Sequence, residues 1–206
     1  MEKFQNKYRI PSARLKNWDY AANGAYFITI CTGKRKHYFG NIENGIMHLS
    51  GIGEIAEKYW LEIPNHFPFI ELGNFVVMPN HVHGILIINN PVETLHCNVC
   101  TKQSNSISES ILQSNSISQS ESISELESKI KKNIIMSEKS PKSGSISTII
   151  RSYKSVVSKY SHIIEANFAW QERFHDHIIR NAESFERIQN YIAQNPKKWS
   201  EDKFYK

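Results

Sequence analysis

The chain has 206 residues, a net charge of +5 at neutral pH and three cysteines. This length suits a single domain with a buried core, and the excess of basic residues favours an anionic partner such as nucleic acid. No apolar run approaches the roughly 20 residues that a membrane helix needs, and three cysteines do not make a disulfide framework. We therefore expect a cytoplasmic protein that binds no membrane.

Apolar periodicity and turn residues predict a mixture of strands and helices. In chain order, the first expected elements are a basic arm at residues 8–20, a strand at 25–32, a basic turn at 33–37 and a hairpin around 44–45. A helix from Ser50 to Pro64 and two strands joined at 79–80 follow. The last ones are a helix at 146–160, a short turn and then a strand within 168–180, and a helix from Asn181 to about Asn195. The basic turn suits a solvated loop and a phosphate contact equally well.

The composition changes abruptly after Ile88. The sequence Gln-Ser-Asn-Ser-Ile-Ser at residues 103–108 recurs at 113–118, and a tract this rich in polar residues cannot bury enough apolar surface to fold. We therefore predict one domain spanning residues 1–206, interrupted by a flexible insertion at about 94–143 whose loss the core should tolerate. This region also contains a Cys-x-x-Cys motif, but without a second pair it does not predict a zinc site.

Two histidines, His81 and His83, interrupt an otherwise apolar run. Alternate residues of a strand share one face, so both imidazoles should project together. Two protonated imidazoles would repel each other, and the pair is better suited to being neutral and sharing a cation. The same motif also occurs in strands that bind nothing, so the pair alone leaves both interpretations open. A second pair, His175 and His177, lies further along the chain.

The last predicted helix has one apolar face and one pair of polar residues. Phe185, Ile188 and Ile192 recur at helical spacing and should pack inward. Tyr191 and Asn195 are four residues apart and therefore lie on one face of the helix. Taken alone, they fit an aromatic residue at the core edge and a helix cap.

Together, these motifs resemble the HUH single-tyrosine transposases, and more closely the REP-associated tyrosine transposases. The resemblance is carried by the His81-Val82-His83 strand followed by Tyr191 and Asn195 on a terminal helix. Further matching segments are Arg9-Ile10-Pro11-Ser12, Asp19-Tyr20, Tyr26-Phe27-Ile28-Thr29, Met78-Pro79-Asn80, Trp170-Gln171 and the stretch 176–181. The resemblance implies an α+β fold, a ferredoxin-like sandwich in which a central antiparallel sheet has helices packed on one side.

The resemblance also implies an activity and a site. Tyr191 would be the nucleophile that cleaves and rejoins single-stranded, hairpin-forming DNA through a 5′-phosphotyrosine intermediate. His81, His83 and Asn195 would bind the metal ion, Mg²⁺ or Mn²⁺, and His177 would be a neighbour of the active site. The implied setting is the bacterial cytoplasm, in association with the nucleoid, and the implied assembly is a monomer or a homodimer.

Basic and aromatic side chains would hold the DNA by phosphate contacts and base stacking. The candidate phosphate contacts are Lys34, Arg35, Arg151, Lys154, Arg173, Arg180, Lys197 and Lys198, and the candidate stacking residues are Trp170, Phe174 and Trp199. Two other functions stay open. One is a non-catalytic nucleic-acid-binding module on the same fold. The other is a metal-dependent phosphodiesterase that uses water and the four histidines of the two pairs.

Overall fold

The computed structural model describes residues 3–4, 7–8, 15, 18–90 and 142–205. Most of the predicted basic arm, the Cys-x-x-Cys motif and the predicted insertion up to residue 141 lie outside the described residues, so their interpretation stays a prediction. No helix within the described ranges is long and apolar enough to cross a membrane.

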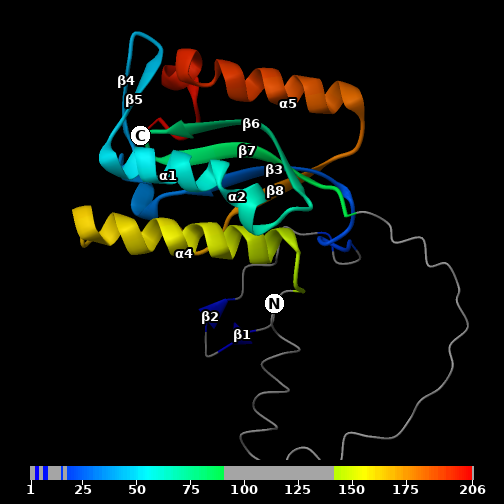
Figure 1. Ribbon diagram of the computed structural model, residues 1–206. Helices are drawn as coiled ribbons and strands as arrows, with labels where there is room; N and C mark the ends of the chain where they lie inside the picture. Colours follow the sequence, from blue (N-terminus) through cyan, green and yellow to red (C-terminus); the bar gives the residue numbers. More distant parts are fainter. Residues whose placement is uncertain (1–2, 5–6, 9–14, 16–17, 91–141, 206) are drawn as a thin grey trace, which may run out of the picture. The chain divides into compact units, whose positions relative to one another are not determined.

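A four-stranded antiparallel sheet forms the centre of the described fold (Figure 1). Its strands, in the spatial order β6-β7-β3-β8, are β6 (Ile70–Met78), β7 (His81–Ile88), β3 (Gly24–Cys31) and β8 (His175–Ile179). The strands are rich in β-branched and aromatic residues, which fit a pleated surface. The predicted turn at residues 79–80 joins β6 to β7, so the two strands pair along their lengths.

Two short hairpins accompany the central sheet. They are β1 (Lys3–Phe4) with β2 (Lys7–Tyr8), and β4 (Gly40–Glu43) with β5 (Ile46–Leu49). The β4–β5 turn is the predicted Asn44-Gly45 pair, and both residues have positive φ, at 51° and 75°. Positive φ at both central residues is the conformation that this dipeptide favours in tight hairpins.

Two helices, α1 and α5, begin at the side-chain caps that the sequence predicted. Ser50 accepts a hydrogen bond from the backbone of Gly53, and Asn181 accepts one from the backbone of Ser184. The helices are η1 (Gly33–Arg35), α1 (Gly51–Leu61), α2 (Ile63–His66), α4 (Ile146–Ile164), α5 (Ala182–Gln194) and η2 (Pro196–Glu201). The single helix predicted from Ser50 to Pro64 is in fact two helices, because Pro64 has no N–H with which to continue α1.

Helices α1 and α4 cover one face of the sheet, which confirms the predicted fold class (Figure 1). Tyr26 and Val82 of the sheet pack there against Trp60 of α1 and Tyr153 of α4, and all four are buried. Helix α5 lies on the opposite face, where Ile188 and its neighbours form a separate apolar cluster with β7 and β8. The sheet is therefore buried on both faces, and the α5 face is the one that carries the candidate site.

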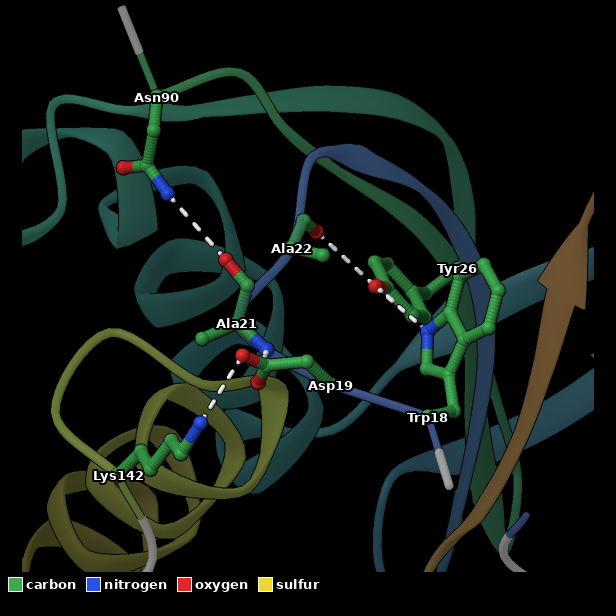
Figure 2. A network of polar contacts seen from close by, with 7 residues as sticks. All are labelled: Trp18, Asp19, Ala21, Ala22, Tyr26, Asn90 and Lys142. Atoms are coloured by element: carbon green, nitrogen blue, oxygen red, sulfur yellow. Dashed lines mark hydrogen bonds and ion pairs between the residues drawn. The ribbon is translucent and has the colours of Figure 1, made fainter. Parts of the chain in front are cut away.

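The two flanks of the predicted insertion are held by a short segment that precedes β3 (Figure 2). The backbone of Asn90 donates to Oδ1 of Asn23 at 2.9 Å. The side chain of Asn90 donates to the carbonyl of Ala21 at 3.3 Å. On the other flank, Nζ of Lys142 lies 3.0 Å from Oδ2 of Asp19. We call this set of contacts the clasp. It holds Asn90 and Lys142, the described residues next to the undescribed stretch 91–141, against the same short segment.

Candidate active site

The face of the sheet toward α5 carries both predicted histidines. His81 and His83 are buried, and the centroids of their rings lie 4.4 Å apart. In the strand register, Thr29 of β3 lies between His83 of β7 and His175 of β8. His81 and His83 are two residues apart on β7, so their imidazoles share one face of the sheet, as strand geometry predicts.

A neighbouring side chain orients each imidazole. Nδ1 of His81 bonds to Oδ1 of Asn80 at 2.8 Å, and Nδ1 of His83 bonds to Oγ1 of Thr29 at 2.9 Å. The amide oxygen of Asn80 can only accept, so Nδ1 of His81 carries the hydrogen and its Nε2 keeps a free lone pair. That Nε2 is buried and has no hydrogen-bond partner among the described residues. This is the arrangement of a metal-ligating histidine with its supporting hydrogen bond.

Burial keeps the histidine pair neutral. It lowers the pKa of His81 to about 3, and the positive charges of Lys203 and Arg35 act in the same direction. Burial also holds the pKa of His83 well below its ordinary value, with a further contribution from His81 itself. Neutral imidazoles have the lone pairs that a cation requires, so at neutral pH the pair can bind a metal without first losing protons.

Helix α5 is fixed over this face by apolar packing and by one polar anchor. Ile188 and Ile192 are buried against the sheet. The pairing of β6 with β7 shifts between Leu72 and Phe75, and within this irregularity the backbone N–H of Asn74 donates to Oε1 of Gln189 at 3.1 Å. A β-bulge redirects a strand locally, and here it brings β6 to the middle of the helix that carries Tyr191.

Tyr191 points from α5 toward the histidine pair. Its hydroxyl lies 3.3 Å from Nε2 of His83, and its ring meets Phe27 edge-on at 6.1 Å. The side chain is 42% exposed, so a ligand can reach it. Partial burial, together with the charge of Asp202, raises the pKa of the Tyr191 phenol. The phenol is therefore protonated at neutral pH, and a nearby cation or proton acceptor is needed to make it a nucleophile.

Asn195 and Asp202 complete the group. Asn195 is the C-cap of α5 and is buried, and its Oδ1 has no partner among the described residues, while its Nδ2 donates to Oδ2 of Asp202 at 3.3 Å. Helix η2 begins at Pro196 and turns the chain back, which brings Asp202 beside the histidines. One ligand atom from each of His81, His83 and Asp202 lies within 4.8 Å of the others.

These atoms fit a divalent cation. Two imidazole nitrogens, the free amide oxygen of Asn195 and a carboxylate are all ordinary ligands of such ions. Nε2 of His81, which is buried and has no partner among the described residues, would gain one from an ion bound between His81, His83 and Asp202. Leaving buried polar atoms unpaired is costly, so the fold has a physical reason to bind an ion here.

The second histidine pair does not join this group. His175 and His177 lie on the same sheet face but are exposed on the edge strand β8. Within the described part of the chain, the cluster of potential metal ligands consists of His81, His83 and Asp202. The four-histidine site considered for a phosphodiesterase is therefore not formed by these residues, and His177 stays a predicted neighbour of the site.

The candidate cations are divided between two surfaces. Lys197 and Lys198 are exposed on η2 beside Asn195, and the guanidinium of Arg35 lies 5.0 Å from the ring centroid of Phe204. Arg151 and Lys154 belong to α4, on the opposite face of the sheet, and the Lys154 ammonium donates to the carbonyl of Gln171 at 2.6 Å and to that of Glu172. The other exposed candidates are Lys34, Arg173 and Arg180.

The aromatic stacking candidates differ in their exposure. Trp199 is buried beside Met78 and Phe204, and Trp170 and Phe174 are half-buried and pack against the main core. The fold adds two residues to the site that neither a motif nor spacing predicted, Asp202 and Lys203. Both follow the periodic part of the last helix, where spacing gives no indication of which way a side chain points.

Comparison with solved structures defines the class of fold. The chain resembles a REP-associated tyrosine transposase whose structure was solved bound to a REP hairpin, with a TM-score of 0.51 and 16% identity, over 94% of this chain and 77% of that one. The described fold is thus the fold of that transposase.

No protein-family model matches the chain. It is 31% identical to an uncharacterized protein of Haemophilus influenzae over 198 residues, which cover 94% of this chain and 92% of that protein. The chain belongs to the same family as this Haemophilus protein.

Proposed function

We propose that the protein is a metal-dependent tyrosine transposase that cleaves and rejoins single-stranded DNA. The observation that carries the proposal is the position of the Tyr191 hydroxyl, 3.3 Å from Nε2 of His83 and beside a group of buried candidate metal ligands. An accessible phenol next to such a group has the placement expected of a nucleophile. The fold shared with a transposase that was solved on a DNA hairpin supports the same assignment.

The residues that would hold Mg²⁺ or Mn²⁺ are His81, His83 and Asn195, and Asp202 would add a carboxylate. When bound, the ion would neutralise the charge that develops on the scissile phosphate. This mixture of nitrogen and oxygen ligands accepts several divalent ions, and the family resemblance is the reason for naming these two.

Tyr191 would attack the phosphorus of a phosphodiester. The bond from Oη to phosphorus forms, the bond from phosphorus to O3′ breaks, and the products are a 5′-phosphotyrosine and a free 3′-hydroxyl. The Asp202 carboxylate, whose Oδ2 lies 3.5 Å from the phenol, is placed to take the phenol proton, and water supplies a proton to O3′. Because the phosphotyrosine keeps the bond energy, the 3′-hydroxyl of another strand can reverse the step without ATP.

The substrate would be single-stranded DNA that folds into a hairpin. Tyr191 opens onto a pocket of about 410 Å³ that Lys198 and Lys203 also line. Two ammonium groups beside the nucleophile suit a phosphate backbone. The proposed place of action is the bacterial cytoplasm, in association with the nucleoid.

The test is an adduct assay. Labelled hairpin-forming DNA from the genome that encodes the protein is incubated with Mn²⁺ and run on denaturing gels, with the wild type, Tyr191→Phe and the control Tyr160→Phe. Tyr160 is an exposed tyrosine of α4, on the opposite face. We expect a metal-dependent covalent adduct that only Tyr191→Phe abolishes.

Two other results would contradict the proposal. Cleavage that survives in Tyr191→Phe without an adduct would indicate a phosphodiesterase that uses water. Binding of the hairpins without any cleavage by the wild type would indicate a nucleic-acid-binding module.

A further inference from the structure

A second pocket lies on the other side of η2 from Tyr191. It has a volume of about 370 Å³ and is bounded by the β4–β5 hairpin on one side and by η2 and the segment after it on the other. This volume is at the lower end of the range of roughly 300–1,000 Å³ that small-ligand sites have. The lining residues that matter here are His37, Asn41, Lys197, Trp199, Ser200 and Tyr205.

Aromatic rings form part of the pocket wall. The ring of Tyr205 meets Trp199 edge-on at 5.4 Å, and His37 meets the same indole at 5.8 Å. Trp199 is buried, whereas Tyr205 is 52% exposed. The wall therefore combines a fixed indole with an accessible phenol ring, and an accessible ring is what a flat aromatic ligand stacks on.

Polar atoms surround these rings. Asn41 donates from Nδ2 to Glu43 at 2.7 Å, which leaves its Oδ1 available as an acceptor. The side chains of His37, Lys197 and Ser200 are exposed and line the same pocket. A purely apolar ligand would leave these groups unpaired, whereas a nucleobase offers donors and acceptors along its edge and a face for stacking. The Lys197 ammonium adds a positive charge that suits the attached phosphate.

The pocket adjoins the candidate active site. The ring of Trp199 lies 6.0 Å from that of His81, which is itself next to His83. Helix η2 lines both pockets, through Lys197 and Ser200 on one side and Lys198 and Glu201 on the other. A strand whose phosphate lies at Tyr191 can thus place a neighbouring nucleotide here.

We propose that this pocket binds one unpaired nucleobase of the DNA strand, close to the phosphate that Tyr191 attacks. The inference rests on the proposed function, because that function is what makes DNA the ligand. A base within a duplex has its faces covered by its neighbours, so the pocket selects a base that is unstacked. It would read the DNA sequence beside the cleavage position through the polar groups on its wall.

The test measures DNA binding by fluorescence anisotropy in EDTA, where metal-dependent cleavage does not contribute. The probes are a mixed-sequence single strand without self-complementarity and an abasic strand of the same length and charge. Tyr205→Ala should weaken binding of the mixed strand by about 5-fold to 100-fold, the effect of losing one base–aromatic stack. It should leave binding of the abasic strand within about twofold, because the phosphate contacts remain.

Two control variants make the result specific. Tyr205→Phe keeps the ring and should bind the mixed strand like the wild type. Tyr160→Ala removes an exposed ring from the opposite face of the sheet and should change neither affinity. Equal losses on both probes with Tyr205→Ala, or no loss on either, would overturn the inference.

The adduct assay separates this inference from the proposed function. If the covalent adduct forms but the effect of Tyr205→Ala does not depend on the bases, the pocket assignment is wrong and the catalytic proposal stands. If the effect depends on the bases but no adduct forms, the pocket binds DNA and the catalytic proposal is wrong.

Discussion

Replacing Asn80 should weaken metal binding although Asn80 is not itself a proposed ligand. Its Oδ1 holds Nδ1 of His81 at 2.8 Å, and its Nδ2 donates to the carbonyl of Phe204 at 2.8 Å and to that of Arg35 at 3.3 Å. Asn80→Ala removes all three contacts. The imidazole of His81 then has nothing to fix its tautomer or its orientation.

The size of the effect follows from these contacts. Loss of a supporting hydrogen bond to a metal-bound histidine typically costs about 10-fold to 100-fold in metal affinity. The side chain is fully buried, so its former partners lose a hydrogen bond without gaining full access to water. Each such buried group costs about 1–3 kcal/mol. We therefore expect the free energy of unfolding to fall by a few kcal/mol as well.

Titration with Mn²⁺, followed by electron paramagnetic resonance or calorimetry, measures the affinity, and urea denaturation measures the stability. Asn80→Asp is the discriminating variant, because it keeps an acceptor for Nδ1 of His81 but cannot donate to Phe204. It should lose stability yet bind Mn²⁺ more tightly than Asn80→Ala. Asn65→Ala, at an exposed asparagine, should change neither quantity. Unchanged Mn²⁺ affinity in folded Asn80→Ala would refute the reasoning.

Three further predictions follow from the site and the clasp. Asp202→Asn should lower the Mn²⁺ affinity by removing a carboxylate from the candidate ligands, whereas Glu201→Gln, at an exposed neighbour, should not. If calorimetry gives Asp202→Asn the same Mn²⁺ affinity as the wild type, Asp202 is not a ligand. The metal-free protein should lose stability as the pH falls from about 6.5 toward 4, because His81 and His83 take up protons in the unfolded chain but not in the fold. Each histidine should lower the free energy of unfolding by up to about 1.4 kcal/mol per pH unit. A free energy of unfolding, measured by urea denaturation, that does not change over this pH interval would contradict the burial of the two histidines. Joining the flanks after deletion of residues 94–141 should leave the melting temperature within a few degrees, since the clasp holds both flanks; a large decrease would show that the insertion supports the core.

Strand and helix periodicity predicted the central geometry of the site. The spacing of His81 and His83 placed both on one face of a strand, and the four-residue spacing of Tyr191 and Asn195 placed them on one face of a helix. Periodicity does not tell which strand meets which helix. The family resemblance supplied that relation, and the fold brings the Tyr191 hydroxyl to His83.

The remaining parts of the site depend on tertiary contacts that spacing does not encode. Asp202 reaches the histidines because η2 reverses the chain after Pro196, and no apolar repeat marks that path. His175 has the same two-residue spacing to a second histidine as His81 has to His83, but it lies on an edge strand and is exposed. The ammonium of Lys154 donates to the backbone carbonyls of Gln171 and Glu172, a contact that its helical spacing does not reveal, and its role as a phosphate contact stays a prediction. In each case, the neighbours in space decide what the residue can do.

The most direct test of the central claim is to identify the residue that becomes covalently attached to DNA. The protein is incubated with Mn²⁺ and hairpin-forming single-stranded DNA, digested with protease and nuclease, and its peptides are sequenced by mass spectrometry. We predict a nucleotide attached through its 5′-phosphate to Tyr191 and to no other tyrosine. Attachment at a different residue, or cleaved DNA with every peptide unmodified, would contradict the assignment of Tyr191 as the nucleophile.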